Sequence, residues 1–230
     1  MIKESKTTIE ERASEQKYVD LLSNSGFKAV FGDRNNDDVV MSIMNTLLPE
    51  HRKVTHIEYL PTEHQGPTLK NKEFRYDFMC KGQDGTSFIV EVERQDDDNW
   101  FKRCVSYAAR AYDRHNKKGQ DYDVQPVYLI GLMGIDIPHP DKDLWKNRYI
   151  SEYTFREKST HDLLAETIII IFAELNRFGK RAEECENGLD RMLYVLKNSG
   201  ELDSPVGWLN DPIYARILRA FEIAKFSKAK

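Results

Sequence analysis

Apolar, β-prone side chains dominate two neighbouring segments, residues 74–80 and 88–94, and a short polar stretch separates them. That stretch contains the pair Asp84-Gly85, and Asp-Gly between two such runs is a strong hairpin signal. The pattern therefore predicts a β-hairpin. Its apolar strands are interrupted by three acidic residues: Asp77 on the first strand, and Glu91 and Glu93 on the second.

Upstream of the hairpin, the apolar positions change to the spacing of a helix. Val39, Val40, Ile43, Met44, Leu47 and Leu48 share one helical face, and Pro49 closes the run. Residues 52–60 then alternate in the manner of a strand. The Gly- and Pro-containing stretch 61–72 predicts a loop.

Downstream, residues 100–115 form the next helical pattern, in which Phe101, Cys104, Val105, Ala108 and Tyr112 share the apolar side. The continuously apolar run 126–132 is short, as expected for a strand covered on both faces. Strand, helix and buried strand in this order make a βαβ unit, which predicts parallel pairing of the two strands.

The remaining patterns predict strands over 149–155 and 167–175, then amphipathic helices over 181–198 and 205–226. The first of these helices would bury Leu189, Met192, Leu193 and Leu196. The whole indicates an α/β protein in three parts: a polar leader (1–17), an α/β domain (18–178) and a helical C-terminal region (179–230).

Composition is that of an ordinary globular protein, with 40% hydrophobic and 31% charged residues among 230. The net charge of −4 counts mildly against a large non-specific DNA footprint. The N-terminus lacks the apolar core of a signal peptide, and the longest apolar run, 168–172, is too short to cross a bilayer. We therefore expect a cytoplasmic protein without membrane association.

Several other chemistries have no support in the sequence. The three cysteines are widely spaced and odd in number, which favours free thiols in a reducing compartment. The six histidines lack metal-binding spacing such as HExxH, so we expect surface or core roles for them. Neither GxxxxGK[ST] nor GxSxG occurs, which argues against ATP binding and serine hydrolase chemistry.

The acidic residues of the hairpin are the main candidates for chemistry. Ionised carboxylates on half-buried strands are costly unless a partner compensates them, and hard cations such as Mg²⁺ take carboxylate oxygens. Side chains alternate along a strand, so Glu91 and Glu93 share a face. Asp77 lies roughly opposite them, with an uncertainty of one residue in register. The alternative is an exposed hairpin face with solvated acids.

The helix over 100–115 carries basic residues on its polar side: Lys102, Arg103, Arg110 and Arg114. A basic helix directly after a carboxylate-bearing strand could face a phosphate backbone. The alternative is an ordinary solvated face. The Asp96-Asp97-Asp98-Asn99 stretch before it favours a helix start.

In the order of these elements the chain resembles the PD-(D/E)XK nuclease family of transposases, also called recombination-promoting nucleases. The resemblance begins in the segment Ser25 to Gly32 and the helix over 39–48, and continues through Tyr76-Asp77-Phe78 and Phe88 to Arg94. Residues 101–107, 126–130 and 189–204 extend it over nearly the whole chain after residue 18. It implies a restriction-endonuclease-like core, with a mixed central sheet flanked by helices.

Carried over residue by residue, the resemblance makes Asp77 and Glu91 ligands of Mg²⁺, with Mn²⁺ as an alternative. The third motif position is lysine in the wider superfamily and glutamine in nearer relatives, but here it is Glu93. Glu93 would act as an extra ligand or base, or else mark a site that has lost activity. Arg94, Gln95 or Lys102 could supply the missing donor. Alternation points Arg94 away from the Glu91 face, whereas Gln95 has the same strand parity as Glu91 and is the better candidate. The DNA contacts would be Lys102, Arg103 and Arg110.

The resemblance therefore implies a metal-dependent DNA endonuclease associated with transposition or recombination, with DNA as its partner and a homodimer left open. The alternative is a catalytically degenerate DNA-binding or regulatory module on the same fold. Two further departures are Asn24, where relatives often have aspartate, and an early end near Phe226. We expect the C-terminal region to be an incomplete accessory part.

Overall fold

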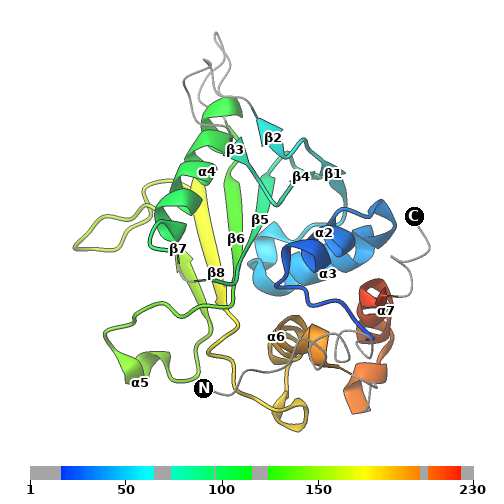
Figure 1. Cartoon of the computed structure of the whole chain (residues 1–230). Helices are drawn as coiled ribbons and strands as arrows, with labels where there is room; N and C mark the ends of the chain where they lie inside the picture. The colour runs from blue at the N-terminus through cyan, green and yellow to red at the C-terminus, as the bar shows by residue number, and fades with distance from the viewer. Residues whose placement is uncertain (1–16, 65–73, 96, 116–123, 203–206, 224–230) are drawn as a thin grey trace.

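A central six-stranded sheet with helices on both faces organises the protein (Figure 1). The computed structural model describes residues 17–64, 74–95, 97–115, 124–202 and 207–223. Most of the expected leader, most of the 61–72 loop and both ends of the expected 205–226 helix lie outside these residues. The predicted α/β class with a mixed sheet is confirmed.

The sheet has the strand order β1-β4-β5-β6-β8-β7. Its β5–β6 and β6–β8 pairs are parallel, and its β1–β4, β4–β5 and β7–β8 pairs are antiparallel. The strands are β1 (Ile57–Tyr59), β4 (Phe78–Gly82), β5 (Ser87–Glu93), β6 (Val127–Met133), β7 (Ile150–Tyr153) and β8 (Ile168–Glu174). A separate antiparallel pair joins β2 (Glu63–His64) to β3 (Phe74–Arg75).

The predicted hairpin is the antiparallel pair β4–β5, in which Phe78 lies opposite Val90 and Lys81 opposite Ser87. Gly85 takes a positive φ of 88° in the turn, a conformation that glycine adopts without steric cost. The Asp84 carboxylate accepts a hydrogen bond from the Thr86 backbone amide at 3.0 Å. These two residues therefore build the turn that their sequence predicts.

The predicted βαβ unit consists of β5, the helix α4 (Trp100–His115) and β6, whose residues are all buried. The buried stripe of α4 contains Trp100, Cys104, Ala108 and Ala111. Because this stripe runs one position earlier than expected, Val105 is 55% and Phe101 37% exposed. The prediction that these two residues lie on the buried side is wrong.

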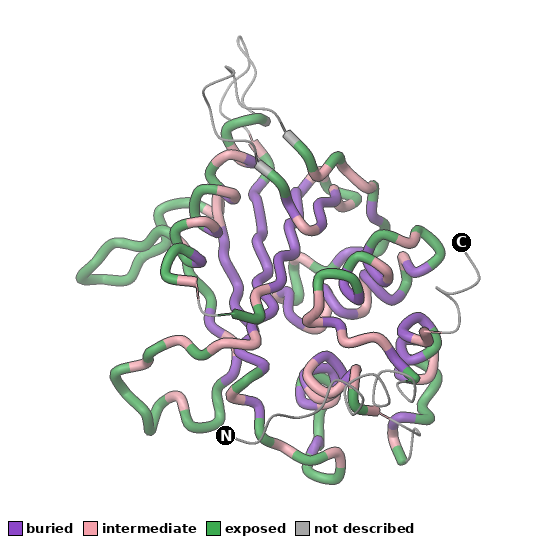
Figure 2. The backbone as a smooth tube through the Cα atoms, in the orientation of Figure 1, coloured by how far each residue is buried: buried purple, intermediate pink, exposed green. Residues whose placement is uncertain are grey.

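The other face of the sheet carries α2 (Asn24–Phe31), α3 (Asp37–Leu47), α6 (Gly188–Asn198) and α7 (Pro212–Phe221) (Figure 1). All four contribute buried side chains to one hydrophobic cluster with this face of the sheet. Figure 2 shows the central strands buried between the two helical layers. Leu189 is 37% exposed at the start of α6, which corrects its predicted burial.

The expected strand over 52–60 is shorter, because β1 contains only Ile57–Tyr59. Upstream of it, the Asn45 side chain donates to the Val54 carbonyl at 2.8 Å and accepts from the Val54 amide at 2.7 Å. These bonds satisfy backbone groups that a strand partner would otherwise pair.

Short helical turns complete the description: η1 (Arg34–Asn36), η2 (Glu50–Arg52), α5 (Lys142–Trp145), η3 (Ala182–Glu184), η4 (Ser199–Glu201) and η5 (Gly207–Asn210). The two ends of the described chain lie together, since the Val19 amide donates to the Phe221 carbonyl at 2.8 Å. Within the described ranges, no helix combines the length and apolar character that a bilayer crossing requires.

Candidate functional site

Asp77 and Glu91 lie side by side on the hairpin. Asp77 directly precedes β4 and Glu91 lies within β5, so continuing the register beyond the Phe78–Val90 pair places them opposite each other. The Asp77 amide donates to Glu91 Oε1 at 3.1 Å. In return, the Val92 amide donates to Asp77 Oδ2 at 3.1 Å. The backbone of each strand thus binds the carboxylate carried by the other.

The Glu91 side chain lies on the α4 face of the sheet. Met79 and Ile89, which alternate in phase with it, belong to the hydrophobic cluster under α4. Glu91 continues this row and is only 3% exposed. Directly beside it in the parallel register is Gly131, where an added Cβ would lie 2.6 Å from the Phe172 ring. A buried carboxylate and tight aromatic packing therefore share this end of the sheet.

Burial and mutual repulsion make the two carboxyl groups poor anions without a cationic partner. Burial, and then the charge of Asp77, raise the pKa of Glu91 well above its ordinary value. Burial also raises the pKa of Asp77, against the opposing effects of the Val92 hydrogen bond and of Lys28 and Arg103. Additional positive charge at this pair would favour the ionised form of both groups.

Glu93 at the third motif position does not join the pair as a free ligand. Arg103 Nη2 lies 2.6 Å from Glu93 Oε2, and the backbone amide of Gln95 donates to Glu93 Oε1 at 3.1 Å. The other arm of the Arg103 guanidinium lies 2.5 Å from the Asp97 carboxylate. In the part of the chain that the structure describes, no group of three or more His, Cys, Asp or Glu side chains could hold a metal.

The Asp77–Glu91 pair nevertheless has the donor chemistry that suits Mg²⁺. This ion keeps several waters and is usually bound through one or two carboxylates together with substrate phosphates. One of the two groups, Glu91, is buried, and the other, Asp77, is partly exposed. Among the described residues, no hydrogen bond or ion pair joins a cationic side chain to either carboxylate, and two adjacent carboxylates of this kind fit such a site.

The other residues predicted for the site differ in accessibility. Lys102 and Gln95 are exposed, whereas Arg110 and Arg103 are partly buried. Both arms of the Arg103 guanidinium bind carboxylates, those of Glu93 and Asp97, and hold Arg103 at the end of β5 rather than extended into solvent. It also lies over the Trp100 ring, 5.0 Å from the centroid.

The sequence patterns gave no role to Tyr107 or Lys28, both of which interact electrostatically with the pair. Tyr107 comes from α4 and packs edge-on against Tyr76, with ring centroids 5.1 Å apart. Burial raises the pKa of Tyr107, and Glu91 and Asp77 add to that effect. Lys28 comes from α2 on the opposite helical layer. The only sequence signal for Lys28 was that its segment, Ser25 to Gly32, is part of the resemblance to the nuclease family.

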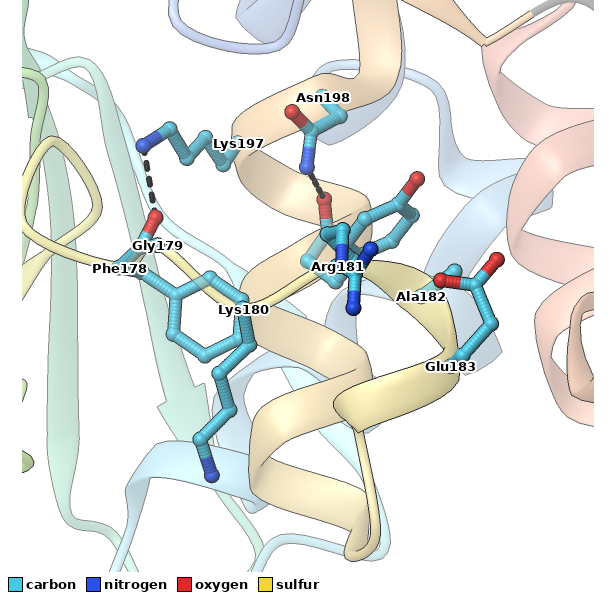
Figure 3. Close-up of a pocket in the computed structure, with 9 residues that line it drawn as sticks. Phe178, Gly179, Lys180, Arg181, Ala182, Glu183, Lys197 and Asn198 are labelled. Carbon is cyan, nitrogen blue, oxygen red and sulfur yellow. Dashed lines mark hydrogen bonds between the residues drawn. The ribbon is translucent and has the colours of Figure 1, made fainter.

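A separate surface cavity of about 440 Å³ lies between α6 and the segment that follows β8 (Figure 3). It is lined by Phe178, Gly179, Lys180, Arg181, Ala182, Glu183, Tyr194, Lys197 and Asn198. Lys197 Nζ donates to the Phe178 carbonyl at 2.7 Å, and the Asn198 amide to the Tyr194 carbonyl at 2.8 Å. None of the acidic hairpin residues lines this cavity, and these two polar side chains bind backbone.

A family model described as PD-(D/E)XK nuclease family transposase matches residues 22–230. The chain belongs to this family. The match spans both the hairpin that carries Asp77 and Glu91 and the C-terminal helices. PD-(D/E)XK nucleases generally use divalent metals and act on DNA. No curated protein and no solved structure matches the chain at a significant level.

Proposed function

We propose that this PD-(D/E)XK family member is a metal-dependent DNA endonuclease that hydrolyses phosphodiester bonds in transposition or recombination. Mg²⁺ is its expected cofactor, and Mn²⁺ would substitute for it. The observation that carries the proposal is the reciprocal bonding of Asp77 and Glu91 across the hairpin. It holds two oxygen donors of the right type side by side.

In this proposal Asp77 and Glu91 hold the cation. When bound, a divalent cation supplies Lewis-acid polarisation of the phosphoryl oxygen and makes water more nucleophilic. The backbone bonds to both carboxylates keep them in place before substrate arrives. Preorganised groups of this kind need no rearrangement during the reaction.

The hydrolysis itself has a simple balance. The oxygen of a water attaches to phosphorus, the bond from phosphorus to the sugar oxygen breaks, and the water releases a proton while the sugar oxygen gains one. The side-chain amide of Gln95, an exposed residue, is a candidate to orient this water. Glu93, bound to Arg103, keeps that guanidinium beside the acidic pair. Exposed Lys102 at the start of α4 would contact the DNA backbone.

Cleavage of supercoiled plasmid in Mg²⁺ or Mn²⁺ tests the proposal. We expect the wild-type protein to nick or linearise the plasmid, and Asp77→Ala and Glu91→Ala to lose this activity. Glu152→Ala, which removes an exposed acid on β7, is the matched control and should cleave like the wild type. Equal cleavage by the two site variants and the wild type would assign the activity to another site or to a contaminant.

The second candidate function is a catalytically degenerate DNA-binding or regulatory module. It is favoured by one observation: the third motif position carries an acid, and both of its oxygens already have donors. Glu93→Gln and Glu93→Lys restore the side chains that relatives have. If the wild type is inert and either variant cleaves plasmid, Glu93 is the lesion. If neither gains activity, the cause lies elsewhere in the protein.

A further inference from the structure

Lys28 is an exposed lysine in the middle of α2, on the side of the sheet opposite α4. Figure 1 shows α2 and α4 in the two different helical layers. None of the hydrogen bonds and ion pairs found within the described ranges involves Lys28 Nζ. A lysine with no acidic partner is available to a ligand, provided that it lies near a place where a ligand binds.

Two attachments fix the position of α2 relative to the acidic pair. At its C-terminal end, the Phe31 ring packs edge-on against Phe78, 5.2 Å between centroids, and Phe78 directly follows Asp77. Just before the helix, the Asp20 carboxylate lies 2.5 Å from Arg94, which directly follows β5. Both attachments lie at the end of the hairpin where β5 finishes and β4 begins.

Leu22 adds a third contact at this place, because an added Cβ on Gly134 would lie 3.5 Å from Leu22 Cδ1. Gly134 directly follows β6, and its amide donates to the Glu93 carbonyl at 2.7 Å. The segment from Asp20 to Phe31 thus passes the strand ends at which the acidic pair lies. Lys28 precedes Phe31 by three residues, which places it on nearly the same side of the helix.

Another cation at this end of the hairpin is Arg103, which comes from α4. Arg103 is already bound by Glu93 and Asp97. Lys28 is therefore the cation near the pair that has no carboxylate bound to its Nζ among the described residues.

We propose that Lys28 binds a non-bridging oxygen of the DNA phosphate that a cation on the Asp77–Glu91 pair would hold. Its ammonium supplies, from α2, the positive charge that Glu93 cannot supply from β5. The catalytic part of this inference rests on the proposed nuclease function. The phosphate contact does not, because a binding module on this fold would use the same ammonium. A lysine is suited to this role as a compact charge with three donors.

The test combines DNA binding with cleavage. The variants are Lys28→Met, Lys28→Arg and the control Lys158→Met, which removes an exposed lysine from the loop between β7 and β8. Binding of a labelled short duplex is followed by fluorescence anisotropy against KCl concentration, with Ca²⁺ in place of Mg²⁺. Single-turnover cleavage of the same duplex is then measured in Mg²⁺.

The salt slope of binding is the slope of the logarithm of the binding constant against the logarithm of the KCl concentration. We expect Lys28→Met to reduce this slope by about one counterion, whereas Lys158→Met leaves it unchanged. Cleavage by Lys28→Met should fall by about 10²-fold, the usual effect of removing one donor to the reacting group, and Lys28→Arg should retain part of it. An unchanged slope in Lys28→Met overturns the inference, whatever happens to cleavage. So does a wild type that does not bind the duplex.

The two proposals fail in different ways. If the wild type binds DNA but does not cleave it, the nuclease proposal fails, while a reduced slope in Lys28→Met still supports the phosphate contact. If the wild type cleaves and Lys28→Met retains both slope and rate, the nuclease proposal stands and the Lys28 inference falls. Unfolding temperatures of all variants should match the wild type, because Lys28 and Lys158 are exposed.

Discussion

The backbone amide of Asp77 donates to the carboxylate of Glu91 at 3.1 Å. Asp77 directly precedes β4 and lies opposite Glu91 of β5. The Asp77 carboxylate is itself bound by the Val92 amide at 3.1 Å. Backbone groups thus hold two acids together in a place where burial opposes their charge. Positive charge at this place would favour the ionised form of both carboxyl groups.

Divalent cations should stabilise the wild-type protein. A cation whose free concentration is 100 times its Kd adds about 2.7 kcal/mol to the free energy of unfolding. This corresponds to a rise in Tm of about 5–10 °C for a domain of this size. We expect this shift on adding MgCl₂ to the wild type in a thermal denaturation assay. Glu91→Gln should lack it and should have a higher Tm than the wild type in EDTA, because a neutral amide is less costly to bury.

Ion pairing of Glu166, at the opposite end of the sheet, should make the free energy of unfolding depend on pH in the acidic range. Arg52 donates to Glu166 through Nε at 3.0 Å and Nη2 at 2.6 Å, and Tyr128 donates its hydroxyl proton. These bonds, chiefly that from Arg52, lower the pKa of Glu166 to about 2. A depressed folded pKa gives stability that is present above the unfolded value of 4.5 and is lost as pH falls toward 2.

Glu166→Gln should therefore lower the free energy of unfolding by about 1 kcal/mol at neutral pH, since the pair is partly exposed. In urea titrations, its difference from the wild type should shrink between pH 5 and pH 2. Glu152→Gln, at an exposed position, serves as the control with little effect at any pH. A constant difference across this range would show that the Glu166 charge does not contribute.

Tight packing beside Glu91 should make Gly131 intolerant of any side chain. An alanine Cβ would lie 2.6 Å from Phe172 Cδ1 and 3.1 Å from Trp100 Cζ2, both in the buried layer under α4. We expect Gly131→Ala to destabilise the protein by about 1–3 kcal/mol in chemical denaturation. Gly188→Ala is the matched control, with no atom within 4 Å of its added Cβ. Equal stability of both variants would contradict the packing described for Gly131.

Local patterns predicted most of the fold. The Asp84-Gly85 turn and the buried run of β6 identified the hairpin and the βαβ unit, because turn chemistry and burial on both faces leave strong signals. Val105 and Leu189 were wrongly predicted to be buried, because periodicity gives the position of a helix's buried face only to about one residue. β1 was overextended because the Asn45 side chain bonds to Val54, a contact that no local pattern shows.

The site could be predicted only as far as strand geometry reaches. Alternation and the turn bring Asp77 and Glu91 to one place, although the sequence left an uncertainty of one residue that only the observed pairing of β4 with β5 resolves. The bond between Glu93 and Arg103 depends on how α4 packs over β5. The approach of Lys28 depends on a helix from the opposite layer. Both depend on how segments with independent sequence patterns pack together.

Calorimetric titration of the protein with Mn²⁺ is the most direct test of the central claim, that Asp77 and Glu91 share one divalent cation. The account predicts one Mn²⁺ per wild-type chain, and loss of this binding in both Asp77→Asn and Glu91→Gln while Glu152→Gln keeps it. Undiminished binding in either site variant, or no binding by the wild type, would contradict it.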